Sequence, residues 1–179
     1  MTDKVYYSGF DSSFGPVFVA STSKGVCLVR FSKVAETKFL LLLRKRFQKD
    51  IIRNDKVLAN VKKGLLDYFN GCPVRFKVPL DLSRGTQFQR KVWHKVREIP
   101  YGELRSYKWV ARLIGSAHAS RAVGNAVGQN PVAPIVPCHR VVCSDGSLGG
   151  YTSGVAIKKR LLSLEGIIGN GDSSLLHAC

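Results

Sequence analysis

The spacing of apolar residues changes at the polar segment 81–85, and this change constrains the fold more than any other feature. Residues 5–31 are rich in β-branched and aromatic side chains and are interrupted by a turn-forming Ser-Lys-Gly trio, which predicts antiparallel strands. Two stretches with helical spacing follow, at 34–50 and 55–71. We therefore predict that residues 1–80 form an α/β domain with a small antiparallel sheet and helices.

Beyond this segment the sequence predicts short helices in succession. Thr86 begins a capping box with the glutamine three residues later, and Ser106 precedes a second helical stretch. A third helix is expected at 119–129, and its closeness to the second predicts a helix-turn-helix. Residues 86–166 are therefore expected to form a mostly α-helical domain with a helix-turn-helix. Residues 167–179, which lack a clear pattern, are expected to form a disordered tail.

The composition favours an anionic partner. Lys and Arg number 28 against 12 Asp and Glu, a net charge of +16 over 179 residues. Nucleic acid is the preferred candidate for this partner, ahead of an acidic membrane surface. A basic surface that is only solvated and binds no partner would give the same composition. The 45% of hydrophobic residues suffices for a core, and no apolar run has the length of a membrane span. Five cysteines without a CxxC pair, behind a charged N-terminus, predict free thiols inside a cell.

The helix expected at 119–129 carries two stripes at helical spacing. The apolar stripe is predicted to face the domain core and consists of Ala119, Ala122, Val123 and Ala126. The other is small or polar around one arginine and consists of Arg121, Gly124, Asn125 and Gly128. A glycine inside a helix costs about 1 kcal/mol relative to alanine, which close approach to a flat partner or tight helix packing would offset. Because a packed interface between helices rarely contains an arginine, Arg121 favours binding to a flat partner over tight helix packing.

A cysteine and a histidine are adjacent in the segment PIVPCHRVV. A thiol reacts as thiolate, and its ordinary pKa of about 8.5 means that Cys138 needs a base. His139 can reach it only if the backbone turns, which Pro137 favours, whereas a buried structural cysteine is the simpler interpretation. Glu165 opposes the dipole at the end of the last predicted helix, and His139 would give it a partner. Arg140 is compatible with a structural ion pair.

Several motifs occur together in the second half of the chain. They are IPYGELRSY, RAVGNAVGQNP, PCHRVV, GGYTSG and LLSLEG. In order and spacing they resemble the O6-alkylguanine-DNA alkyltransferase family, the methylated-DNA–protein-cysteine methyltransferases. The resemblance is dense from Phe88 to Gly166, where it implies a winged-helix-like helix-turn-helix. Over residues 1–80 it implies a ribonuclease-H-like fold. It further implies a suicidal DNA repair protein that transfers an alkyl group, mainly methyl, from O6 of guanine, and from O4 of thymine, to its own cysteine.

The resemblance assigns catalytic roles to residues of this chain. Cys138 would accept the alkyl group, His139 would take the thiol proton through a water, and Glu165 would orient the imidazole. Asn130 would tie the recognition helix to the active-site turn, and a plain helix cap before Pro131 is compatible with that role. Tyr107 would donate a proton to N3 of the leaving guanine, although a core tyrosine is the simpler role.

The resemblance also assigns residues to the flipped base and to DNA. The base pocket would be formed by Tyr107, Val141, Gly149, Tyr151 and Thr152. The Val141 carbonyl would accept from the exocyclic amine, and Thr152 would face O6. An alkylated oxygen inside a duplex is out of reach, so the nucleotide must be flipped out, and Arg121 would fill the gap. The third helix would lie in the minor groove through Ala119, Ser120, Arg121, Gly124 and Asn125.

The expected partner is double-stranded DNA that contains O6-alkylguanine. We expect no cofactor, no membrane, and no metal, because Cys27, Cys72 and His94 lack the spacing of a zinc site. A monomer is expected, and cooperative binding to DNA is left open. The expected location is the nucleus of a eukaryote or the cytoplasm of a prokaryote. The basic runs 44–46 and 158–160 fit import signals or solvated surfaces. Two alternatives are a multiple-turnover cysteine hydrolase and a lesion-recognising DNA-binding protein that does not react.

Overall fold

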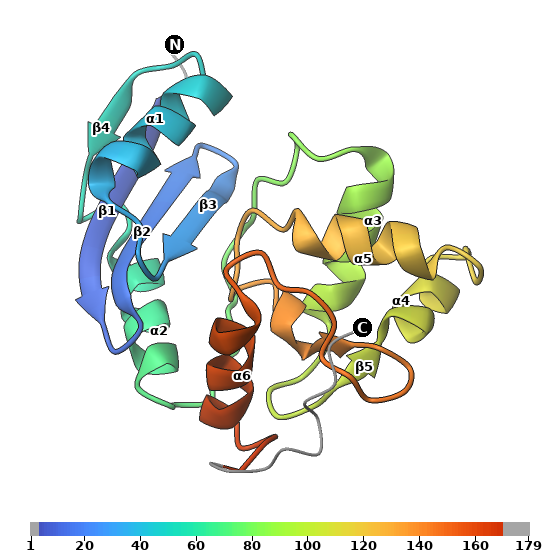
Figure 1. Cartoon of the computed structure of the whole chain (residues 1–179). Helices are drawn as coiled ribbons and strands as arrows, with labels where there is room; N and C mark the ends of the chain where they lie inside the picture. Colours follow the sequence, from blue (N-terminus) through green and yellow to red (C-terminus); the bar gives the residue numbers. More distant parts are fainter. Residues whose placement is uncertain (1–3, 170–179) are drawn as a thin grey trace. The chain divides into compact units, whose positions relative to one another are not determined.

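The computed structural model describes residues 4–169 (Figure 1). The chain divides into two compact units, the first ending at Leu82 and the second beginning at Ser83. This division falls within the polar segment 81–85, where the spacing of apolar residues changes. Each unit has its own sheet and its own helices.

The first unit is built on a four-stranded sheet of order β3-β2-β1-β4. Its strands are β1 (Val5–Ser12), β2 (Gly15–Thr22), β3 (Gly25–Phe31) and β4 (Ile51–Arg53). The first three pair antiparallel, as predicted, whereas β4 pairs parallel with β1 and makes the sheet mixed. The parallel pairing was not predicted because a three-residue strand is too short to show an alternating pattern.

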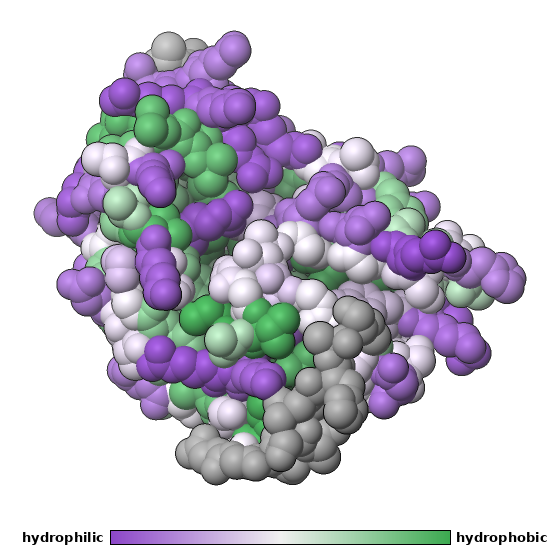
Figure 2. Space-filling view, in the orientation of Figure 1, coloured by the Kyte–Doolittle hydropathy of each residue, from purple (hydrophilic) through white to green (hydrophobic). Residues whose placement is uncertain are grey.

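Two helices supply the rest of the core of this unit. They are α1 (Glu36–Arg46), which buries Phe39 and Leu43, and α2 (Ala59–Phe69), which buries Leu65 and Tyr68. Phe39 and Leu43 belong to one cluster with residues of all three long strands. Burial of a large apolar side chain is worth about 1.5–3 kcal/mol. The buried apolar side chains of α1 and α2 are therefore the main contribution of these helices to the stability of the unit. Hydrophilic residues are spread over the face of the protein shown in Figure 2.

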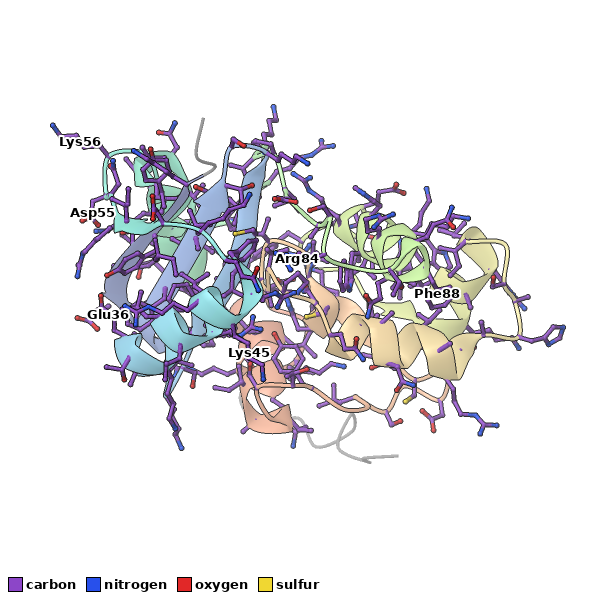
Figure 3. All side chains as sticks on the ribbon, turned by 90° about the horizontal axis from the view of Figure 1, so that it is seen from above. Glu36, Lys45, Asp55, Lys56, Arg84 and Phe88 are labelled. Carbon is purple, nitrogen blue, oxygen red and sulfur yellow. The ribbon has the colours of Figure 1, made fainter. Side chains whose placement is uncertain are left out.

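Ion pairs connect the short strand β4 to its surroundings. Arg53 contacts Glu36 at 3.4 Å and Asp55 at 3.7 Å, and both carboxylates are labelled in Figure 3. The Tyr7 hydroxyl also donates to Glu36, at 2.9 Å, and the Ser8 hydroxyl donates to Asp55. The ion pairs are half exposed, so each is worth less than about 1 kcal/mol.

The segment before the division returns to the edge of β3. The Val26 amide donates to the Pro79 carbonyl at 2.9 Å, and the Asp81 amide donates to the Val26 carbonyl at 2.9 Å. The Thr22 hydroxyl donates to the buried Asp81 carboxylate at 2.6 Å. Gly25 permits this approach, because a Cβ atom there would lie 2.3 Å from the Pro79 oxygen and its φ is +133°.

We expect the substitution Gly25→Ala to lower the free energy of unfolding by about 1–3 kcal/mol, because the added methyl group collides with Pro79 and forces a left-handed backbone on alanine. Urea denaturation measures the loss. Lys24→Ala, at the exposed neighbouring position, is the control and should change stability by less than about 0.5 kcal/mol. Equal stability of the two variants would contradict the close approach.

The second unit consists of short helices with a small parallel sheet. Its elements are α3 (Gln87–Arg97), β5 (Arg105–Ser106), α4 (Tyr107–Leu113), α5 (Ser120–Gly128), the 3-10 turn η1 (Cys138–Arg140), β6 (Val141–Val142) and α6 (Val155–Leu164). Both predicted caps are confirmed, since Thr86 and Gln89 form the capping box and the Ser106 hydroxyl accepts from the Trp109 amide at 3.0 Å. α5 packs on α3 and α4, and the Trp93 indole donates to the Ala126 carbonyl at 2.7 Å.

The buried face of α5 differs from the predicted one. Val123, Ala126 and Val127 are buried, whereas Ala122 is exposed, so its assignment to the core was wrong. Alanine fits a surface as well as a core, so its position on a helical wheel carries little information about burial. The second stripe is confirmed as outward-facing, since Arg121, Asn125 and Gly128 are exposed and Gly124 is half-buried.

The chain after α6 continues to pack on the second unit. Ile168 is buried in a cluster with Val142, Leu148 and Leu162, and Ile167 contacts the same cluster. The prediction of a disordered tail from residue 167 was therefore wrong for these two isoleucines, whose side chains complete an apolar core. Residues 170–179 of that predicted tail lie outside the described residues. None of the helices between residues 4 and 169 is both long and apolar enough to cross a membrane.

Candidate active site

A tight turn brings the cysteine and the histidine into the interior of the second unit. Pro137 precedes the turn with φ −81°, and the Arg140 amide closes it by donating to the Pro137 carbonyl at 3.0 Å. Cys138 and His139 are both buried, with exposed fractions of 5% and 0%. A proline fixes its own φ, so the sequence favours this turn locally.

Asn130 joins the end of α5 to this turn. Its side-chain nitrogen donates to the Val136 carbonyl at 2.7 Å and to the Cys138 sulfur at 3.1 Å, and its oxygen accepts from the Val132 amide at 3.0 Å. The Asn130 side chain is buried, and both its nitrogen and its oxygen form hydrogen bonds within the protein. The sulfur of Cys138 is therefore held in a fixed position relative to α5.

Glu165 at the end of α6 collects hydrogen bonds from the turn. Its Oε1 lies 2.7 Å from Nε2 of His139 and 2.9 Å from Arg140, and its Oε2 accepts from Arg140 at 2.8 Å. The Gly102 amide adds a fourth contact at 3.1 Å. Arg140 also donates to the Ile99 carbonyl at 2.6 Å. The bidentate arginine pair accounts for a glutamate that opposes the helix dipole.

The protonation states of this group follow from burial and from the hydrogen bonds. Burial by itself raises the pKa of Glu165, but hydrogen bonds and charges from His139 and Arg140 lower it to about 2. Burial lowers the pKa of His139 below its usual value, against the opposing effect of Glu165. The imidazole is therefore neutral at pH 7. Because an ionised carboxylate only accepts, Nε2 carries the proton, and Nδ1 of the neutral ring carries the lone pair that can accept another one.

The thiol is harder to ionise than an exposed one. Burial raises the pKa of Cys138, while hydrogen bonds from Asn130 and Tyr151 and the charge of Lys158 act in the opposite direction. A buried thiol with a raised pKa reacts only if a base removes its proton. The adjacent neutral imidazole of His139 is such a base.

A cavity of about 890 Å³ lies between α4, α5 and the loop before α6. It brings together most of the predicted pocket and DNA-facing residues, namely Tyr107, Ser120, Arg121, Gly124, Asn125, Gly149, Tyr151 and Thr152. Two predicted residues, Val141 and Ala119, are not among the residues that line it. Val141 is fully buried, and its carbonyl accepts from Lys158 at 2.6 Å. A space of this size suits a small planar molecule.

Two contacts define the walls of this cavity. At Gly149, an added Cβ atom would lie 3.1 Å from the Tyr107 hydroxyl and 3.3 Å from the sulfur of Cys143. The Thr152 hydroxyl donates to the Gly128 carbonyl at the end of α5. The loop is therefore attached to α5 through Thr152, and the absence of a side chain at Gly149 leaves room beside Tyr107. Tyr151 connects the cavity to Cys138, since it lines the cavity and lowers the pKa of the Cys138 thiol.

Comparison with known proteins places both units in one family. The model of the ribonuclease-like domain of 6-O-methylguanine DNA methyltransferase matches residues 5–82, and that of its DNA-binding domain matches residues 87–167. A methylated-DNA–protein-cysteine methyltransferase from Methanosarcina acetivorans is 41% identical over 162 residues, which cover 90% of this chain and 99% of the relative. The chain belongs to the 6-O-methylguanine DNA methyltransferase family.

Solved structures of methyltransferases in this family have the same fold. The O6-methylguanine methyltransferase of Mycobacterium tuberculosis matches with a TM-score of 0.76 at 38% identity, over 97% of this chain and 99% of that one. The protein of the same organism in complex with DNA matches with a TM-score of 0.75 at 38% identity, over 89% and 92% of the two chains. The predicted fold class, a ribonuclease-H-like unit followed by a helix-turn-helix unit, is thereby confirmed.

Sequence reasoning missed two residues near the methyltransferase site. Lys158 was assigned to a basic surface run, but its side chain is fully buried, with an exposed fraction of 0%. Cys143 was left without a role and lines the cavity beside Gly149. One signal was present for Lys158, because it lies next to Ile157 and three positions before Leu161, which share an apolar face at helical spacing. For Arg140 the sequence was compatible with a structural ion pair, and the structure shows one with Glu165.

Proposed function

We propose that this chain is a single-use DNA repair protein that transfers the alkyl group from O6 of a flipped-out guanine to the sulfur of its own Cys138. The observation that carries the proposal is the arrangement around that sulfur. The Asn130 side chain donates to the sulfur of Cys138 at 3.1 Å. His139, which follows Cys138 in the sequence, is a neutral base that lies 2.7 Å from Glu165. The methyltransferase relatives support the same reaction.

The reaction begins with removal of the thiol proton. Nδ1 of His139 takes this proton from Cys138 through a water molecule, and the Glu165 carboxylate stabilises the imidazolium that forms. Glu165 is suited to this role because its pKa of about 2 keeps it ionised. Arg140 fixes the carboxylate from its other side, so the imidazole does not have to be oriented during the reaction.

The transfer itself exchanges one bond for another. The thiolate of Cys138 forms a sulfur–carbon bond while the bond between the alkyl carbon and O6 breaks, and the electron pair of that bond stays on guanine. The guanine anion takes up one proton, which the Tyr107 hydroxyl in the cavity donates at N3 and later recovers from the imidazolium. Charge and protons therefore balance. The thioether is stable, so each molecule acts once.

Double-stranded DNA is bound through the outward-facing stripe of α5. Small side chains permit close approach to the minor groove, and the stripe with its neighbours comprises Ala119, Ser120, Arg121, Gly124 and Asn125. Arg121 lies at the cavity that receives the flipped base, and its side chain enters the duplex to fill the gap that the nucleotide leaves in the base stack. Thr152 and the loop amides near Tyr151 face O6. The same pocket accepts O4-alkylthymine, and the protein acts as a monomer inside the cell.

A stoichiometric reaction with duplex DNA containing O6-methylguanine tests this function. Intact mass spectrometry should show the gain of one methyl group per protein molecule, and Cys138→Ser should show none. Repeated turnover of an acyl substrate by Cys138 would favour a cysteine hydrolase instead. Binding of the lesion without a covalent change in the protein would favour a DNA-binding protein that does not react.

A further inference from the structure

A lysine is completely buried and donates to a carbonyl three residues after the reactive cysteine. Lys158 lies on α6 with an exposed fraction of 0%. Its ammonium group donates to the Val141 carbonyl at 2.6 Å and to the Leu148 carbonyl, and it lies 5.9 Å from the centre of the Tyr107 ring. These contacts involve β6, the loop before α6 and α4. A single side chain therefore connects three elements that surround the site.

The ammonium group has no carboxylate as its counter-ion in the described part of this unit. The ion pairs there join Lys95, Arg105, His139 and Arg140 to glutamates, and none includes Lys158. Burial of an ammonium ion costs several kcal/mol unless an anion or hydrogen bonds compensate. Two backbone carbonyls offset only part of this cost. A buried cation in such surroundings is stabilised by an anion nearby.

The groups that face Lys158 include two that can supply this anion. The thiols of Cys138 and Cys143 both raise the pKa of Lys158, but burial has the larger effect and lowers it to about 8. Conversely, the charge of Lys158 lowers the pKa of Cys138 and of His139. The remaining facing group, Tyr107, presents its ring. The coupling between lysine and thiol is mutual, as two interacting charges require.

We propose that Lys158 is the counter-charge of the Cys138 thiolate, a positioning residue that stabilises the ionised nucleophile while its hydrogen bonds to Val141 and Leu148 hold the pocket wall. The proposal rests on the proposed function only for the identity of the alkyl donor. His139 removes the proton, and Lys158 stabilises the charge that remains on sulfur. Once the sulfur is alkylated it is neutral, and Lys158 loses its counter-ion.

The test measures how the reactivity of Cys138 depends on pH. The full chain is treated with iodoacetamide over a range of pH and digested with trypsin, which cleaves after Arg140 and so separates Cys138 from Cys143. Lys158→Gln keeps hydrogen-bonding capacity but removes the charge, and should move the midpoint of Cys138 alkylation upward by about one pH unit, a tenfold loss of thiolate. Lys158→Arg keeps the charge and should stay near wild type.

The matched control is Lys159→Gln, which removes the same charge from the partly exposed neighbour and should leave the midpoint unchanged. A midpoint for Lys158→Gln equal to that of wild type would overturn the proposal. If wild type fails to accept a methyl group from DNA but the midpoint still shifts in Lys158→Gln, the proposed function falls and the counter-charge stands.

A second measurement leaves Lys158 in place, in case Lys158→Gln does not fold. Carbon-13 NMR follows the titration of the Lys158 side chain in wild type and in Cys138→Ser. Loss of the thiolate should lower the pKa of Lys158, because the same coupling acts in both directions. An unchanged titration of Lys158 would contradict the proposal without any variant of the lysine itself.

Discussion

The substitution Glu165→Ala is expected to lower the free energy of unfolding by about 3–5 kcal/mol, because it leaves a buried guanidinium without its anion. Arg140 makes two hydrogen bonds to this carboxylate, at 2.8 and 2.9 Å, and His139 makes a third at 2.7 Å. Alkyl transfer by the remaining folded protein should also fall at least tenfold, since the imidazolium loses its partner.

Chemical denaturation and single-turnover kinetics measure the two effects of Glu165→Ala. The control is Glu98→Ala, which removes a half-exposed carboxylate that pairs with Lys95 at 3.0 Å. That exposed pair should change stability by less than about 1 kcal/mol. Equal losses of stability in the two variants would show that the buried network around Glu165 stabilises the fold no more than an exposed ion pair does.

The same carboxylate predicts how stability depends on pH. The pKa of Glu165 is about 2 in the folded chain against an ordinary value of 4.5. A lowered pKa means that the contribution is complete above the ordinary value and is lost as the pH falls from there toward the folded value. Wild type should therefore lose stability more steeply than Glu165→Gln between about pH 5 and pH 3. Parallel pH profiles of the two proteins would contradict the assignment.

The substitution Arg121→Ala should slow the repair of duplex DNA roughly 10- to 100-fold, because flipping a nucleotide costs a few kcal/mol and the arginine offsets part of that cost. Arg121 is exposed on α5 and lines the cavity that would receive the base. The reaction with free O6-benzylguanine needs no flipping. We therefore expect the rate with the free base to be nearly unchanged.

Rates on the two substrates are compared directly for Arg121→Ala. Arg112→Ala is the control, because it removes the same charge from the exposed surface of α4 without altering the cavity. It should weaken duplex binding modestly through lost phosphate attraction and leave the chemical step intact. If Arg121→Ala slows both substrates equally, Arg121 supports the pocket and takes no part in flipping.

Local signals in the sequence predicted local structure well. The capping residues Thr86 and Ser106 begin their helices because their side chains bind the first free amides, which depends only on neighbours in the chain. Pro137 favoured the turn at Cys138 for the same reason. The pairing of β4 with β1 was not predicted, because it depends on contacts between residues far apart in the sequence.

The site shows the same division between local and tertiary information. The adjacency of Cys138 and His139 and the position of Glu165 at a helix end suggested a relay, and the structure places Glu165 2.7 Å from the imidazole. Lys158 was misassigned because a lysine in a basic run is ordinarily exposed. Only the fold shows that the carbonyls of Val141 and Leu148 converge on its ammonium group.

The identity of the alkylated atom tests the central claim most directly. After reaction with DNA containing O6-methylguanine, trypsin digestion places Cys138 in the peptide that ends at Arg140 and Cys143 in the one that follows. Tandem mass spectrometry should find the methyl group on the sulfur of Cys138. A methyl group on Cys143, or on no cysteine at all, would contradict the account.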